Sequence, residues 1–172
     1  MRLASTSRET VMSVAFRIRV LILLLFAWPP AHARVGEAEV REGPRGGPCF
    51  TIAAREARLG TPDFQAIAVW DGVHPVWKMA MPKDHTFSLT YGMCVPYGGR
   101  VAALPRTASA PLLPGRVYNL RIDARMASGR TASAYEARFC VVRQRDGGAV
   151  VHQIGSGDRE GRRMAGCVAQ GE

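Results

Sequence analysis

The sequence predicts an all-β domain, built as an antiparallel sandwich of about seven short strands. Apolar residues recur with a period of two along much of the chain after residue 48, which is the spacing of a strand with one buried face. Glycine, proline and aspartate interrupt these runs at short intervals, as they do in turns. Four cysteines lie in the same part of the chain and could staple such a fold: Cys49, Cys94, Cys140 and Cys167.

The first half of this domain contains short candidate strands bounded by glycine, proline or aspartate. Residues 64–70 alternate, so Phe64, Ala66, Ala68 and Trp70 are expected on one side of a strand. Residues 53–59 could instead form a helical turn or two. The other candidate strands are residues 49–53, 75–79, 86–91, 94–95 and 100–104.

The second half contains the clearest strand, residues 117–124, whose apolar and polar residues alternate without a break. Residues 134–143 form the next candidate strand, and Gly147-Gly148 is expected to turn the chain back into a strand over residues 149–154. The inward-facing residues of the clearest strand are expected to be Tyr118, Leu120, Ile122 and Ala124.

A local motif makes the fold class more specific. Leu112 lies six residues before Tyr118, with Pro114-Gly115 between them. This spacing resembles the tyrosine corner of fibronectin type III and related immunoglobulin-like sandwiches, in which a buried tyrosine returns its hydroxyl to the backbone of the preceding turn. The alternative is an ordinary hairpin turn followed by a core tyrosine, and both interpretations keep the region β.

Residues 1–33 have the features of an export signal. Arginines precede an apolar run over residues 20–28, and Ala31-His32-Ala33 offers a small-x-small cleavage site. The start could be Met1 or Met12, and the predicted cleavage is the same for both. A spanning helix is the weaker alternative, because the run is about half the ~20 apolar residues that a bilayer requires. We therefore expect a soluble periplasmic or secreted protein without membrane insertion after cleavage.

The exported part would begin with a flexible lead-in over residues 34–48, which are charged and rich in glycine and proline, followed by one sandwich domain over residues 49–172. An oxidising compartment makes two disulfides the expected state of four cysteines, and their isolated positions disfavour a zinc site. Three connectivities are possible. Cys140 with Cys167 is favoured slightly, because only a covalent bond would order the polar tail before Cys167, and Cys49 would then pair with Cys94.

Composition and motifs disfavour several functions. The formal net charge is +9, but the basic residues are scattered and nearly all arginine, so we expect no nucleic-acid partner. The chain has no nucleophile elbow, no zinc-protease motif and no phosphate-binding loop. His74, His85 and His152 lie in segments of loop or strand composition without a catalytic partner at recognisable spacing. The sequence thus predicts no catalytic residues, no metal and no cofactor.

Large aromatic residues near turns are the candidate partner-binding residues. Trp77, Tyr97 and His74 are expected to contribute to a binding surface, because buried interface anchors are often aromatic. Trp70 ends an alternating strand and is therefore expected to face the core more than Trp77 does.

Several segments together resemble a family, the periplasmic immunity proteins associated with type VI secretion. The similar segments are residues 47–52 (Gly-Pro-Cys-Phe-Thr-Ile), 92–95 around Cys94, 113–122 and 134–141. The resemblance implies a protein that binds a toxic effector delivered into the periplasm and blocks it without catalysis. The chain departs from many family members in having no lipidation cysteine, and the Cys167 extension lies outside the similar pattern.

A second function remains open at this point. An exported carbohydrate- or surface-binding module could be built on the same sandwich, and it would share the signal, the strands and the disulfides. The genes beside this one would distinguish the two, since a toxin gene favours immunity and polysaccharide genes favour the module.

Overall fold

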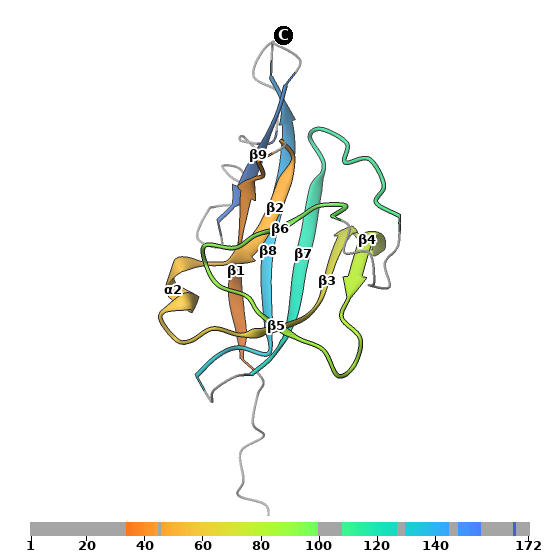
Figure 1. Ribbon diagram of the computed structural model, residues 1–172. Helices are drawn as coiled ribbons and strands as arrows, with labels where there is room; N and C mark the ends of the chain where they lie inside the picture. Colours follow the sequence, from red (N-terminus) through yellow and green to blue (C-terminus); the bar gives the residue numbers. More distant parts are fainter. Residues whose placement is uncertain are drawn as a thin grey trace, which may run out of the picture. The chain divides into compact units, whose positions relative to one another are not determined.

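The computed structural model describes residues 34–44, 46–99, 108–126, 130–144 and 148–155, together with Cys167. The predicted signal, the candidate strand over residues 100–104 and the turn residue Gly147 lie outside these residues. The described elements all belong to the compact unit Ala33–Glu172. They are β1 (Val35–Glu42), β2 (Pro48–Ile52), α2 (Ala54–Ala57), β3 (Asp63–Asp71), β4 (His74–Ala80), β5 (Phe87–Ser88), β6 (Val95–Pro96), β7 (Val117–Arg125), β8 (Ala134–Arg143) and β9 (Ala149–Ile154) (Figure 1).

The all-β prediction is confirmed, but the strands join in one sheet. Its order is β4-β3-β7-β8-β1-β2-β6, with β5 paired to β3 and β9 paired to β8. The expectation of purely antiparallel pairing is wrong at one place, because β1 runs parallel to β8 over residues 35–37. Beyond that point β1 leaves β8 and pairs with β2 from Ala38 to Glu42. A strand that changes partner in this way lets the sheet curl, and in Figure 1 β2 and β6 are drawn over β8.

The curl encloses an aromatic core. Phe50 of β2 lies 6.2 Å from Trp77 of β4 and 5.5 Å from Phe139 of β8, measured between ring centroids. These contacts join strands that are far apart in the sheet order. Apolar side chains of β3 and β7 complete the core, which includes the fully buried Ile67, Val69 and Ile122.

Strand β1 corrects the expectation of a flexible lead-in over residues 34–48. Ala38 and Val40 are buried, while Glu37, Glu39 and Arg41 lie at positions more open to solvent. The segment therefore has the strand period, but its inward residues are small and its outward residues charged, so its mean hydropathy resembles that of a linker. Gly36 is buried opposite Tyr135 of β8, and a Cβ there would lie 2.6 Å from the Tyr135 ring. The tyrosine ring thus covers the glycine across the parallel pair.

The side chain of Gln153 forms hydrogen bonds with the backbone of β1 near the point at which β1 changes its partner from β8 to β2. Its Oε1 accepts a hydrogen bond from the Val40 amide at 2.6 Å, and its Nε2 donates to the Ala38 carbonyl at 3.1 Å. The amide of a β9 residue thus replaces the backbone of a neighbouring strand. This matters because backbone groups that lose water without gaining a partner cost free energy.

Gln153→Leu is therefore expected to lower the free energy of unfolding by ~2 kcal/mol, because one backbone donor and one acceptor lose their partner at a partly buried site. Urea denaturation would measure the change. Gln144→Leu is the matched control, since the Gln144 side chain is exposed and should be nearly neutral. Equal effects of the two changes would contradict the bridging role of Gln153.

Strand β3 has the predicted position but not the predicted face. Phe64 is buried, and the inward set then shifts to Ile67 and Val69. The cause is a bulge, because Phe64 pairs with Ala124 whereas Ala66 pairs with Asp123, which leaves Gln65 as an extra residue. Ala68 and Trp70 consequently lie on the outer face of the sheet. One inserted residue reverses every later side chain of a strand.

The predicted inward residues of β7 are all buried, and Tyr118 makes the expected contact with the preceding turn. Its hydroxyl accepts a hydrogen bond from the Leu113 amide at 2.7 Å and lies 3.4 Å from the Leu113 carbonyl, to which it can donate. Gly115 takes a positive φ of 77° in that turn, a conformation that glycine adopts without strain. The turn and the strand are thereby joined.

Tyr118→Phe is expected to cost ~1–2 kcal/mol of unfolding free energy, because it leaves the Leu113 amide without its partner while keeping the ring. Thermal or urea unfolding would measure it. Tyr91→Phe serves as the control, since the Tyr91 side chain is exposed. A stability loss below that of the control would contradict a stabilising hydrogen bond between the Tyr118 hydroxyl and Leu113.

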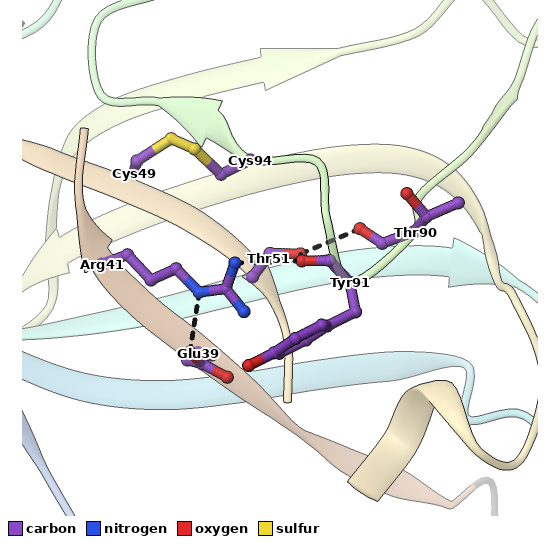
Figure 2. Close-up of a disulfide and its surroundings, with 7 residues drawn as sticks. All are labelled: Glu39, Arg41, Cys49, Thr51, Thr90, Tyr91 and Cys94. Atoms are coloured by element: carbon purple, nitrogen blue, oxygen red, sulfur yellow. Dashed lines mark hydrogen bonds and ion pairs between the residues drawn. A yellow bond between two sulfur atoms is a disulfide. The ribbon is translucent and has the colours of Figure 1, made fainter. Parts of the chain in front are cut away.

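Both preferred disulfide pairings are confirmed: Cys49 is bonded to Cys94 and Cys140 to Cys167. The first disulfide ties the loop after β5 to strand β2. The strand predicted over residues 86–91 is only Phe87–Ser88 in the structure. The chain turns after Ser88, and a backbone carbonyl of this turn accepts a hydrogen bond from a side chain of β2. The hydroxyl of buried Thr51 donates to the Thr90 carbonyl at 3.1 Å (Figure 2).

The same loop is held a second time by Arg41. The Arg41 guanidinium lies 4.0 Å from the centre of the Tyr91 ring, and its Nε donates to Glu39 Oε1 at 2.7 Å (Figure 2). The hydrogen bond with Glu39 raises the pKa of Arg41.

In the described part of the chain, we find no helix with the length and apolarity needed to cross a membrane.

Candidate functional site

The outer face of the sheet carries a row of three functional side chains. Strand register places Trp70 of β3 opposite Asn119 of β7, and Asn119 opposite Arg138 of β8. Residues paired in register point to the same face of a sheet, so an indole, an amide and a guanidinium lie side by side. Trp70 is half-buried, whereas Asn119 and Arg138 are exposed.

The next row along the strands is charged. Ala68 pairs with Arg121, Arg121 with Glu136, and Glu136 with Glu37 of β1. Arg121 donates to Glu136 Oε1 at 2.8 Å and to Asp123 Oδ1 at 2.7 Å. The hydrogen bond with Asp123, aided by the charge of Glu136, raises the pKa of Arg121. This guanidinium is therefore committed to two carboxylates on its own face.

A buried carboxylate borders the face on the side of α2. Glu56 is 3% exposed and receives two hydrogen bonds from Arg34 Nη2, at 2.7 and 2.9 Å. Arg55 of the same helical turn pairs with Glu37 at 2.8 Å. Burial is also the main cause that raises the pKa of neighbouring Tyr135. These ion pairs connect α2 to β1 and its preceding residue. Each of the four charged side chains thereby has a partner of opposite charge.

Together these groups surround a hollow of about 1000 Å³ on the sheet face. Four arginines line it, and three of them have carboxylate partners within 3 Å: Arg34, Arg55 and Arg121. Arg138 has no ion-pair or hydrogen-bond partner among the described residues. The apolar part of the lining includes Trp70 and Val73, and Val73 is 85% exposed at the turn between β3 and β4.

Comparison of the chain with protein-family models, curated proteins and solved structures gives no match. In the described residues no three side chains of His, Cys, Asp or Glu gather in a way that could hold a metal ion. The hollow instead presents an aromatic surface, an amide and one uncommitted cation on a sheet, which are the elements of a recognition site.

The position of Trp77 corrects its prediction as a partner-binding residue. Its side chain is fully buried, 5.4 Å from the Tyr97 ring and 6.2 Å from Phe50. The reason is strand alternation, since Trp77 and Met79 face inward on β4 and both are buried. Its indole Nε1 is buried without a hydrogen-bond partner. Trp77 is therefore a core residue, and Trp70 is the more accessible of these two tryptophans.

The other two predicted binding residues lie in different surroundings. Tyr97 is half-buried over Trp77, and its hydroxyl donates to the Ala110 carbonyl at 2.7 Å. Burial, with a smaller contribution from Tyr118, raises the pKa of Tyr97 to about 12. His74 is exposed, and its backbone is in register with that of Asp71 at the end of the β3–β4 hairpin. The structure groups Trp77 with Tyr97 in the core and leaves His74 at the hairpin.

The row formed by Trp70, Asn119 and Arg138 was not predicted from the sequence. The alternation of β7 already indicated that Asn119 points outward, and the alternation of β8 could have indicated the same for Arg138. The bulge at Gln65 concealed Trp70, because a simple period of two over residues 64–70 places it beside Phe64. No local signal brings the three residues together, since they belong to three strands.

Proposed function

We propose that this chain is an exported binding protein, an immunity protein that neutralises a periplasm-directed toxic effector of type VI secretion by forming a complex. The observation that carries the proposal is the hollow on the outer sheet face, where Trp70 and the guanidinium of Arg138, unpaired within the residues that the structure describes, lie in one row on either side of Asn119. A rigid sheet that presents an aromatic residue and a charge is suited to recognition of another protein. The resemblance of residues 47–143 to that family supports the same function.

The proposed compartment is the periplasm. Two disulfides support it, because such bonds persist in oxidising spaces and are rare in the cytosol. Residues 1–33 supply the export signal in this proposal. The disulfide between Cys49 and Cys94 would then form only after export.

We also propose that the curled sheet is an immunoglobulin-like or fibronectin type III-like sandwich. Strands β4, β3, β7 and β8 would form one layer, and β2, β6 and the second part of β1 the other. The hydrogen bonds of Tyr118 to Leu113 and the contacts of Phe50 with Trp77 and Phe139 support this assignment.

A carbohydrate- or surface-binding module is the second candidate. The specific observation in its favour is that Trp70 and Asn119 are in register on adjacent strands, since an aromatic face beside an amide can stack on and hydrogen-bond to a sugar. The unpaired guanidinium of Arg138 favours a charged partner over a neutral glycan, so we rank protein binding first.

Export should be essential for protection, because the effector acts in the periplasm. A susceptible bacterium that expresses the full chain is expected to survive a type VI attacker that delivers the effector encoded beside this gene. The chain without residues 1–33 should not protect, and a different export signal fused to residue Arg34 should restore protection. Survival counts in competition assays would measure this. Protection by the chain that lacks any signal, or turnover of a substrate by the purified protein alone, would contradict the proposal.

A further inference from the structure

The structure points to the kind of partner surface that the hollow receives. We infer that it binds an acidic segment of a partner protein, with a carboxylate on Arg138 and an apolar side chain against Trp70. This inference rests on the proposed function for the identity of the partner, but the binding chemistry can be tested without it.

The four arginines that line the hollow face three glutamates, and the pairs Arg34–Glu56, Arg55–Glu37 and Arg121–Glu136 use all three. The remaining cation is Arg138. An exposed guanidinium without a partner is well suited to a carboxylate from outside, because its planar fork matches the two carboxylate oxygens.

Asn119 is paired with both Trp70 and Arg138, so it separates the apolar and the cationic ends of one row. Side chains in register on adjacent strands repeat at the strand spacing of about 5 Å, so the row from β3 to β8 spans about 10 Å. Two alternate side chains of an extended segment are separated by about 7 Å, which is close enough for one to reach Trp70 and the other Arg138. The Asn119 amide lies between them and can bond the backbone of that segment.

The rest of the hollow disfavours a strongly basic or a wholly apolar segment. The lining contains four arginines and three glutamates, so its net formal charge is about +1, which disfavours a strongly basic segment. Apolar side chains such as Val35, Trp70 and Val73 also line the hollow, but a wholly apolar segment would leave the Arg138 guanidinium without a carboxylate. An alternating acidic and apolar sequence fits this distribution.

The test uses a fluorescent peptide of alternating aspartate and leucine and its counterpart of alternating asparagine and leucine, titrated with the purified protein. We expect the acidic peptide to bind at least about tenfold more tightly than the neutral one, and its affinity to fall as salt is raised. Arg138→Glu should weaken the acidic peptide by about tenfold or more, which corresponds to about 1.4 kcal/mol.

Arg143→Glu is the matched control. Arg143 lies on the same strand, is exposed and causes the same change in net charge, but it is not part of the hollow. Its effect should stay below about twofold if position matters rather than total charge. Equal losses in the two variants, equal binding of the two peptides, or no binding of the acidic peptide would each overturn the inference. Chitohexaose or cellohexaose that binds through Trp70 and is unaffected by Arg138→Glu would overturn it in favour of a glycan.

The competition assay separates this inference from the proposed function. If Arg138→Glu loses the peptide but still protects as well as Arg143→Glu, the immunity function stands and another surface binds the effector. If the acidic peptide binds as expected but the full chain never protects, the recognition site stands and the immunity function fails.

Discussion

Trp77→Ala is expected to lower the free energy of unfolding by ~3–5 kcal/mol, because it empties the centre of a packed aromatic cluster. The side chain is fully buried and contacts Phe50 and Tyr97. Urea denaturation followed by circular dichroism would measure the loss. Any weakening of partner binding by this variant would then follow from loss of folded protein rather than from loss of a contact.

Trp70→Ala is the matched control for this change. It removes the same side chain from the neighbouring strand, but from a half-buried position on the outer face. We expect a distinctly smaller stability loss and a clear loss of partner binding. A larger destabilisation by Trp70→Ala than by Trp77→Ala would contradict the assignment of the two faces.

The unpaired indole nitrogen of Trp77 sharpens the same prediction. Trp77→Phe removes a buried donor that has no partner, so part of the cost of the lost volume should be offset. Phenylalanine at this position is therefore expected to be much better tolerated than alanine.

Replacing both Cys49 and Cys94 by alanine is expected to cost ~4 kcal/mol of unfolding free energy in the chain-entropy treatment. The bond closes a separation of 45 residues, so its removal releases a long loop in the unfolded chain. The loss also frees the segment that Arg41 and Thr51 hold against β1 and β2 (Figure 2). Chemical denaturation of the oxidised wild type and the double variant would measure the difference.

The second disulfide provides the comparison. Cys140 and Cys167 are separated by 27 residues, for which the same treatment gives a slightly smaller value of ~3.5 kcal/mol. The purified protein should contain no titratable thiol, and an unreduced digest should link Cys49 to Cys94 and Cys140 to Cys167. Four reactive thiols in native protein, or a double variant as stable as the wild type, would contradict the role of these bonds.

Much of the fold follows from local pattern. The bounds of β8 and β9 agree with the candidate strands over residues 134–143 and 149–154, and all four predicted inward residues of β7 are buried. The short helix α2 also lies within its predicted segment. These predictions succeed because a strand with one buried face must alternate, and alternation is written in consecutive residues.

The sequence by itself predicted the all-β class, the later strands and the contact of Tyr118 with the preceding turn, and it slightly favoured the observed pairing of the cysteines among three. Tertiary structure alone decided that β1 joins β8 in parallel, that a bulge at Gln65 moves Trp70 outward, and that Trp77 is buried. It also decided that Trp70, Asn119 and Arg138 form one row. The physical reason is that alternation is local, whereas partner, register and face depend on pairing between distant segments, where a single extra residue reverses a strand.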